Sequence, residues 1–223
     1  MNLKEYALIV AGGKGTRLKS KLPKQFLELL GLPVLMHTIN AFFRYNPAIT
    51  IILVLPEDDF DLWEELCKRH NFDKPLILQK GGASRFQSVK NGLSQITDSG
   101  LVAIHDGVRP LVSTSVIASS FQLAGVHKSA VAAVALKESI RIVEGEQTRA
   151  TDRSSFKLIQ TPQTFDVSII QAAYQTDERP EFTDDASVVE HAGHIIFLFE
   201  GSYENIKITT ADDLVMAEAL MRK

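Results

Sequence analysis

The chain has 223 residues, of which 45% are hydrophobic and 23% charged, and it carries a formal net charge of −3. This composition is typical of a globular protein whose core needs neither a metal nor disulfides. The single cysteine, Cys67, excludes an intramolecular disulfide and a cysteine-based metal cage. Nonspecific nucleic-acid binding needs a basic face, which the mild acidity argues against. No stretch has the length of a signal peptide core or a membrane span, so we expect a cytoplasmic protein.

The charge is unevenly distributed. Five cations and no acid lie between positions 14 and 24, namely Lys14, Arg17, Lys19, Lys21 and Lys24. The other 19 cations and 27 acids leave the rest of the chain at −8. The segment is therefore a candidate site for a polyanion.

Short apolar runs alternate with amphipathic stretches along the chain. The runs predict strands at residues 6–10, 50–55, 76–79, 101–105 and 130–136, and the stretches predict helices at residues 33–45, 57–70, 84–96 and 113–127. This rhythm indicates an α/β fold, a Rossmann-like, mostly parallel twisted sheet with helices on both faces. Ligands bind beyond the carboxyl ends of such strands. We therefore expect the polar loops after Val10, Gln79 and His105 to meet at one edge.

Residues 137–152 break this rhythm. An alternating stretch at 139–143, a turn at 144–147 and a returning segment at 148–151 predict a protruding β-hairpin arm, too poor in apolar residues to form its own core. A second copy of the chain is a natural surface for the arm to pack on. Apart from the arm, we expect residues 1–223 to form a single domain, closed by a helix that a Thr210–Asp213 capping box begins.

A glycine-rich loop follows the first predicted strand. It reads Ala11-Gly12-Gly13-Lys14-Gly15-Thr16-Arg17 and is followed by Pro23-Lys24-Gln25. A Walker A loop is excluded because Gly15 follows Lys14, and a dinucleotide fingerprint is excluded because Leu18 stands where the third glycine is needed. Backbone N–H groups of such a loop, with Arg17 and Lys24, suit a triphosphate. The alternative is a surface turn with solvated lysines.

Five further motifs follow in order. They are Gly81-Gly82-Ala83-Ser84-Arg85 with Ser88, then His105-Asp106-Gly107-Val108-Arg109-Pro110, then Gln160-Thr161-Pro162-Gln163, then Thr183-Asp184-Asp185-Ala186-Ser187, and finally Asn205-Ile206-Lys207-Ile208-Thr209. Together with the glycine loop, they resemble the 2-C-methyl-D-erythritol 4-phosphate cytidylyltransferase family of the nucleotidyltransferase superfamily, which has a glycosyltransferase-A-like fold. The resemblance implies a homodimeric enzyme that transfers the CMP moiety of CTP to methylerythritol phosphate and releases pyrophosphate.

The resemblance also implies roles for individual residues. The catalytic cations would be Arg17, Lys24, Arg153 and Lys207. The nucleotide would be bound by Ala11, Gly12, Gly13, Gly15, Gly81, Gly82, Ala83 and Ser88. The acceptor would be bound by Arg109, Ser139 and Thr183, with Ser139 and Arg153 supplied by the arm of the neighbouring subunit. Asp106 would help to hold Mg²⁺.

The implied chemistry fits these residue types. The second pKa of a phosphate monoester is about 6, so the acceptor is largely ionised at neutral pH and needs no general base. The difficulty is to bring two polyanions together and to neutralise charge at the α-phosphate. Cations, backbone donors and a metal-binding carboxylate meet that need.

Several residues have simpler interpretations. Arg153 could be a surface arginine, and Asp184-Asp185 could merely begin a helix. We expect His105 to support Asp106, and the pair His191 and His194 lacks a third metal ligand nearby. The remaining candidates are expected in the core; they are Cys67, Phe42, Phe43 and Trp63.

Departures from the family pattern leave the acceptor open. Gly107-Val108 stands where the family usually has Ala-Ala, and Glu138-Ser139 where it often has Asp-Thr. The alternative acceptor is ribitol 5-phosphate or a related polyol phosphate. A nucleotide-binding module without catalysis is a remote alternative, because it would be expected to lose Lys24, Asp106 or Lys207.

Overall fold

The computed structural model describes residues 3–12 and 22–223. Three of the expected site residues, Gly13, Gly15 and Arg17, lie outside these ranges. No helix within them is long and apolar enough to cross a membrane.

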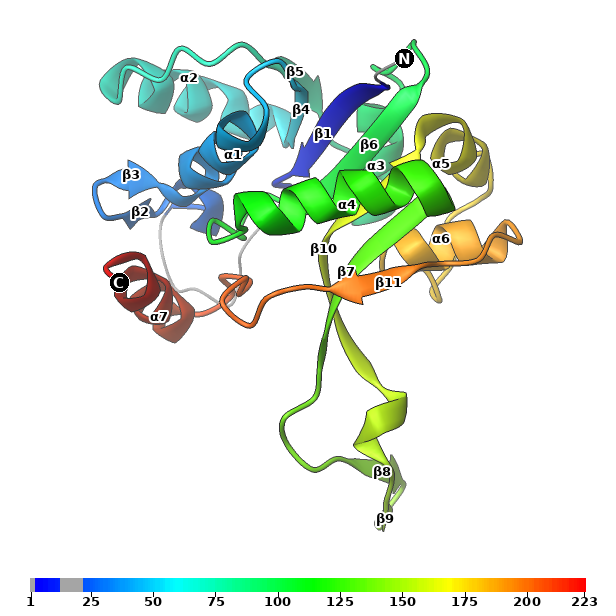
Figure 1. Cartoon of the computed structure of the whole chain (residues 1–223). Coiled ribbons are helices and arrows are strands. Elements are labelled where there is room, and N and C mark those ends of the chain that lie inside the picture. Colours follow the sequence, from blue (N-terminus) through cyan, green and yellow to red (C-terminus); the bar gives the residue numbers. More distant parts are fainter. Residues whose placement is uncertain (1–2, 13–21) are drawn as a thin grey trace.

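The described residues form a seven-stranded sheet of order β11-β7-β10-β6-β1-β4-β5 (Figure 1). Its strands are β1 (Lys4–Val10), β4 (Thr50–Leu55), β5 (Ile77–Lys80), β6 (Gly100–Asp106), β7 (Ser129–Ala135), β10 (Lys157–Asp166) and β11 (Leu198–Glu200). All neighbouring strands are parallel except β10, which runs antiparallel to both β6 and β7. The predicted mostly parallel sheet is confirmed.

Helices cover both faces of the sheet, as the alternation of strand and helix predicts. One face carries α1 (Val34–Tyr45), α2 (Phe60–Arg69) and α4 (Thr114–His127), and the other carries α3 (Arg85–Leu93), α5 (Val167–Ala173) and α6 (Asp185–His191). Successive side chains of a strand point to opposite faces. In β1, Ala7 and Ile9 pack with the first group, whereas Leu8 packs with the second.

Some boundaries differ from the prediction. The stretch predicted as one helix over 57–70 begins with a 3₁₀ turn, η2 (Glu57–Asp59), and the α-helix starts only at Phe60. The helix predicted over 84–96 ends at Leu93, and Ser84 is its N-cap, accepting a hydrogen bond from Gln87 N. Strand β10, helix α5 and strand β11 were not among the predicted elements, and α6 begins at Asp185, where a helix start was one interpretation of the sequence.

A smaller cluster lies beside the sheet. It combines the short hairpin β2 (Glu28–Leu29) and β3 (Leu32–Pro33) with the last helix, α7 (Ala211–Met221). At the start of α7, Thr210 Oγ1 accepts a hydrogen bond from Asp213 N, and Asp213 Oδ2 accepts one from Thr210 N. The predicted capping box is therefore confirmed. Val108 and Ile208 are buried in this cluster. It therefore fixes the backbone next to Asp106 and Lys207.

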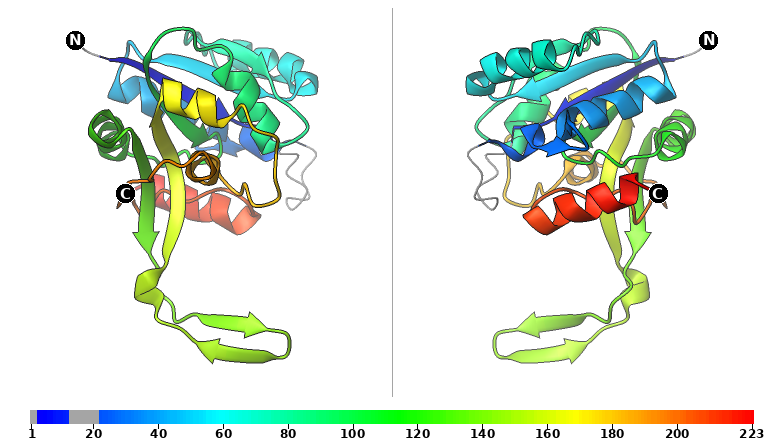
Figure 2. Two further views of the ribbon diagram at one scale, coloured as in Figure 1. Left: turned by 90° about the vertical axis from the view of Figure 1, so that its right-hand side faces the viewer. Right: turned by 90° about the vertical axis from the view of Figure 1, so that its left-hand side faces the viewer.

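The arm extends away from the body of the molecule (Figure 2). It contains the antiparallel pair β8 (Arg141–Glu144) and β9 (Gln147–Ala150), followed by the 3₁₀ turn η3 (Arg153–Ser155). Its strands are mostly exposed, and Gly145 occupies the turn with a positive φ of 63°. The predicted hairpin is confirmed, with a tighter turn than expected.

Candidate functional site

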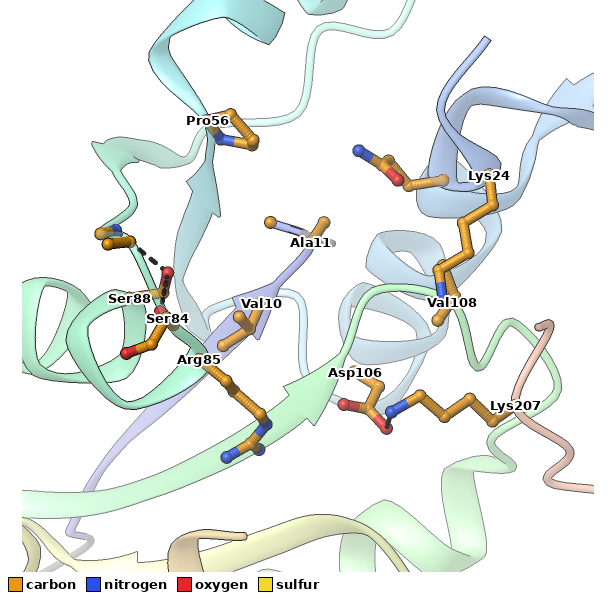
Figure 3. Close-up of a pocket in the computed structure, with 14 residues that line it drawn as sticks. Val10, Ala11, Lys24, Pro56, Ser84, Arg85, Ser88, Asp106, Val108 and Lys207 are labelled. Carbon is orange, nitrogen blue, oxygen red and sulfur yellow. Dashed lines mark hydrogen bonds and ion pairs between the residues drawn. The ribbon is translucent and has the colours of Figure 1, made fainter. Parts of the chain in front are cut away.

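A cavity of about 620 Å³ lies beyond the carboxyl ends of the parallel strands. The loops after β1, β5 and β6 all reach it, through Gly12, Gly82 and Val108 respectively. The expectation that these polar loops meet at one edge is confirmed for the described residues. Figure 3 shows Ser84 and Ser88 on one side of this cavity, and Lys24 and Lys207 on the opposite side.

The serine side of the cavity is built from backbone and hydroxyl groups. Ser88 Oγ accepts a hydrogen bond from Gly82 N at 3.1 Å and donates one to Ser84 O at 2.8 Å. A Cβ at Gly82 would collide with Gln87, so only glycine lets the loop approach α3 this closely. Gly82, Ala83 and Ser88 line the cavity, and Gly81 is tied to β4 by a bond from its N–H to Leu55 O at 2.8 Å. Such a wall suits the flat, polar edge of a base.

Asp106 stands at the end of β6, opposite that wall. Its Oδ2 lies 3.0 Å from Arg109 Nε and 3.1 Å from Lys207 Nζ. Burial alone would raise the pKa of Asp106, but the positive charges of Lys207, Arg109 and Arg85 hold it well below its usual range. Asp106 is therefore an ionised carboxylate throughout the physiological pH range.

Hydrogen bonds to neighbouring backbone groups hold Lys207 and Arg109 in place. Ile208 N donates to Val108 O at 2.9 Å, which brings Lys207 beside the end of β6. Arg109 Nη1 donates to Asn205 O at 2.8 Å, and Asn205 Nδ2 in turn donates to Thr161 O at 2.8 Å. The segment before α7 is thus joined to the loop after β6 and to β10 at the site.

His105 supports this arrangement from within the core. Its Nδ1 lies 3.0 Å from Thr161 Oγ1, and its Nε2 lies 3.3 Å from Arg109 O. Burial lowers the pKa of His105 to about 4, against the opposing effect of Asp106. The ring is therefore neutral at physiological pH and holds Arg109 and Thr161 by hydrogen bonds.

A second, smaller cavity of about 260 Å³ adjoins the first. The two cavities share three residues, Arg85, Asp106 and Lys207. Arg109 and Thr183, both expected near the acceptor, line the smaller cavity. Five of the residues expected to bind the nucleotide line the larger cavity; they are Ala11, Gly12, Gly82, Ala83 and Ser88.

Strand β10 supplies much of the smaller cavity. Its register against β7 shifts between Ile159 and Gln163, and the peptide between Thr161 and Pro162 is cis. Gln160, Thr161 and Gln163 line the cavity. Gln163 also donates to Asp184 Oδ2 at 2.9 Å and accepts from Ala186 N at 2.9 Å, which fixes the start of α6.

Arg85 was not assigned a role from the sequence. Its guanidinium makes two hydrogen bonds with the carboxylate of Asp185, at 2.8 and 2.6 Å, and Tyr174 Oη donates to the same carboxylate at 2.7 Å. Asp185 is fully buried, so it does more than begin a helix. Burial alone would lower the pKa of Arg85, but the charge of Asp185 raises it above its usual value. The only sign of this pair in the sequence is that Arg85 and Asp185 each belong to one of the motifs quoted above.

Two expected site residues lie on the arm. Arg153 begins η3, and its guanidinium donates to Lys137 O. Arg153 and Ser139 are exposed, and neither lines either cavity of its own chain. The structure thus separates Arg153 and Ser139 from the other expected site residues that it describes.

The site offers one carboxylate that suits Mg²⁺. Both ion pairs of Asp106 use Oδ2, and its Oδ1 has no hydrogen bond or ion pair with any described residue. Mg²⁺ commonly binds through one or two carboxylates together with substrate phosphates. The described residues contain no cluster of three His, Cys, Asp or Glu side chains that could hold a metal without such a substrate. Asp106 therefore fits a cation that arrives with a triphosphate.

A sequence profile described as 2-C-methyl-D-erythritol 4-phosphate cytidylyltransferase matches residues 6–223. The chain belongs to this family. Family members in Bacteroides fragilis and Porphyromonas gingivalis bear the same description. The first is 50% identical over 215 residues, covering 96% of this chain and 98% of the relative, and the second is 46% identical over 222 residues, covering 99% of each.

Solved structures of the family agree with the fold. The 4-diphosphocytidyl-2C-methyl-D-erythritol synthase of Anaerococcus prevotii superposes with a TM-score of 0.84 at 28% identity, covering 99% of this chain and 97% of that one. The 2-C-methyl-D-erythritol 4-phosphate cytidylyltransferase of Thermus thermophilus gives a TM-score of 0.77 at 30% identity, covering all of both chains. Family membership makes this chain a cytidylyltransferase of isoprenoid biosynthesis.

The departure from the family pattern at Gly107-Val108 has a local structural basis. A Cβ at Gly107 would lie 2.8 Å from Ala11 Cβ and 3.0 Å from Leu35 Cδ1, so glycine accommodates the packing of α1 under the site. Val108 is buried in the cluster with Ile208 and borders the larger cavity. Val108 therefore contributes directly to the wall of the larger cavity, and Gly107 allows the close packing behind it.

Proposed function

We propose that CTP binds in the larger cavity and 2-C-methyl-D-erythritol 4-phosphate in the smaller one, and that the reaction takes place between them. The products are 4-diphosphocytidyl-2-C-methyl-D-erythritol and pyrophosphate. The observation that carries the proposal is the position of Asp106 and Lys207, which line both cavities and lie 3.1 Å apart. An acceptor phosphate held by Lys207 would lie beside a triphosphate held by Lys24.

In the reaction, an oxygen of the acceptor phosphate attacks the α-phosphorus of CTP. The bond from that phosphorus to the oxygen bridging the α- and β-phosphates breaks, and pyrophosphate leaves with the electron pair. The residues provide position and charge rather than a proton acceptor. Lys24 and Arg17 stabilise charge at the α-phosphate, whereas Lys207, Arg109 and the neighbouring subunit's Arg153 and Ser139 hold the acceptor.

The larger cavity has two ends with different chemistry. Ala11 and Gly12, with Gly13 and Gly15 of the same loop, bind the triphosphate through backbone N–H groups. Gly81, Gly82, Ala83 and Ser88 bind the cytosine. Thr183 contacts the acceptor from the smaller cavity.

We propose Mg²⁺ as the cofactor, held by Asp106 Oδ1 and by the triphosphate. When bound, it neutralises phosphate charge and polarises the phosphoryl oxygens. Asp106 is suited to this because its pKa is held low by Lys207 and Arg109 against the effect of burial. Its Oδ2 meanwhile orients those two cations.

We also propose a cytoplasmic homodimer in which each subunit is a single domain, residues 1–223, with the arm at about 137–152. The support is the arm itself, whose Ser139 and Arg153 reach neither cavity of their own chain. A two-fold dimer in which the arms are exchanged would bring each arm to the partner's smaller cavity.

The test is pyrophosphate release with CTP, Mg²⁺ and one acceptor at a time. We expect turnover with methylerythritol phosphate. Turnover with ribitol 5-phosphate and none with methylerythritol phosphate would reassign the acceptor. This is the alternative raised by the departure from the family pattern at Val108. The proposal would be contradicted if neither acceptor led to release of pyrophosphate, including the case in which CTP binds but no turnover follows.

A further inference from the structure

Gln25 carries a buried hydrogen-bond acceptor that has no donor. The residue belongs to the 3₁₀ turn η1 (Lys24–Phe26) and is 1% exposed. Its Nε2 donates to Asp59 Oδ2 at 3.1 Å, but its Oε1 has no hydrogen-bond partner within residues 3–12 and 22–223. An ionised carboxylate only accepts hydrogen bonds, so Asp59 fixes which end of the amide faces it. The unpaired atom is therefore the amide oxygen.

This oxygen belongs to a side chain that lines the larger cavity. Gln25 contributes to its wall together with Lys24 and Gly12. A buried acceptor without a donor destabilises the protein, and such atoms are rare in native structures. A molecule that fills the cavity and carries a hydrogen-bond donor would remove this cost.

The chemistry of CTP restricts which donor this can be. Its ionised phosphates only accept hydrogen bonds, so its donors are the two ribose hydroxyls and the exocyclic amine of cytosine. We propose that Gln25 Oε1 accepts a hydrogen bond from one of these nucleoside donors when CTP binds, which makes Gln25 a specificity-determining residue. This inference rests on the proposed function for the identity of the nucleotide.

Asp59 acts on this contact through Gln25. It lies in η2, directly after β4, and its contact with Gln25 ties η1 to that strand. Burial raises the pKa of Asp59, and the hydrogen bond from Gln25 opposes that rise. Asp59 is thus a positioning residue that directs the amide oxygen of Gln25 away from itself.

Calorimetric binding of four nucleotides tests the proposal in the presence of Mg²⁺. CTP is compared with 2′-deoxy-CTP, 3′-deoxy-CTP and the 5′-triphosphate of pyrimidin-2-one riboside, each of which lacks one of the three donors and adds none, on the wild type and on Gln25→Met. Methionine has nearly the same length and removes the amide. We expect Gln25→Met to weaken CTP binding about tenfold, which corresponds to about 1.4 kcal/mol. For the one analogue that lacks the relevant donor, the loss should shrink to less than about twofold.

The same binding measurements include the result that would overturn the inference. An equal loss for all four nucleotides, or no loss for any, would show that Gln25 Oε1 has no donor on the nucleoside. Gln25→Asn, which withdraws the amide by one methylene, is the second variant if Gln25→Met does not fold, and it should show the same coupling. Asp58→Asn, at an exposed acid that lines neither cavity and lies in the same 3₁₀ turn as Asp59, is the matched control, and it should bind CTP within about twofold of the wild type.

The same measurements distinguish a failure of the role inferred for Gln25 from a failure of the proposed function. A wild type that binds CTP tightly but shows no coupling at position 25 would refute the role of Gln25 alone. A wild type that does not bind CTP at all would overturn both the inference and the proposed function.

Discussion

Lys207 Nζ lies 3.1 Å from Asp106 Oδ2 at the boundary of two cavities, although 100 residues separate them in the sequence. The contact is built by backbone pairing, since Ile208 donates to Val108 on the loop that follows Asp106. A cation at this position can face either substrate. The carboxylate beside it prevents the cation from turning away and still has one oxygen left for a metal.

Asp106→Asn is predicted to raise the Mg²⁺ concentration needed for half-maximal activity by about tenfold or more. Asparagine keeps the shape of the side chain but loses the charge that attracts the cation. The measurement is pyrophosphate release over a Mg²⁺ titration at saturating CTP. Asp58→Asn, at an exposed acid outside both cavities, serves as the control and should leave the titration unchanged. An identical Mg²⁺ requirement in Asp106→Asn would remove the metal from this residue.

The buried His105 predicts a pH dependence of stability. Its folded pKa is lowered to about 4 from 6.5, so between these values the unfolded chain binds more protons than the folded chain. The free energy of unfolding should therefore fall as the pH drops from about 6.5 to about 4, by up to about 3 kcal/mol from this residue.

Urea unfolding at several pH values measures that decline. His105→Gln should show a shallower decline over the same window, and His194→Asn, at an exposed histidine, should not differ from the wild type. Equal slopes in the wild type and in His105→Gln would contradict the assignment of a neutral, buried imidazole.

Asp185→Asn is predicted to lower the free energy of unfolding by about 3 kcal/mol or more, because it leaves the Arg85 guanidinium without its charged partner. Tm should fall by several degrees. Glu190→Gln, at an exposed acid on the same helix, provides the comparison. A Tm within one degree of the wild type would show that the buried pair contributes little.

Mixing two inactive variants tests the exchange of arms. Lys24→Ala is expected to lower kcat at least 100-fold, and a loss below about tenfold, or 1.4 kcal/mol, would already remove Lys24 from the transition state. Arg153→Ala should likewise be nearly inactive. In a mixed dimer, one site combines an intact Lys24 with an intact Arg153 from its partner.

After denaturation and joint refolding of equal amounts, about a quarter of the wild-type activity should return, because half of the dimers are mixed and each has one complete site. Lys4→Ala, at an exposed lysine on the opposite edge of the sheet, should keep full activity on its own. No recovery in the mixture, with each variant folded, would place Arg153 in the site of its own chain.

The regular part of the fold could be predicted from the sequence because each signal there is local. The apolar run at 50–55 and the Thr210–Asp213 capping box both appear in the structure as predicted. Asp106 could be placed at the crevice because a polar residue directly follows a buried strand of a parallel sheet.

The rest depends on contacts distant in the sequence. The polar segment Gln160–Gln163 does not resemble a central strand, and it can lie there only because His105, Asp184 and Ser202 satisfy its side chains. The pairing of Arg85 with Asp185 spans 100 residues. The orphaned oxygen of Gln25 is likewise visible only once Asp59 is known to hold the other end of the amide.

The division of the site into a nucleotide cavity and an acceptor cavity is the central claim, and the KM values of both substrates in two variants test it directly. Ser88→Ala removes the hydroxyl that holds Gly82 in the larger cavity, and Thr183→Val removes a hydroxyl from the smaller one. We predict that Ser88→Ala raises the KM for CTP by about tenfold and changes that for methylerythritol phosphate by less than about twofold, with the reverse in Thr183→Val. If either variant raised both KM values equally, or if each raised the KM of the other substrate, the two-cavity account would be wrong.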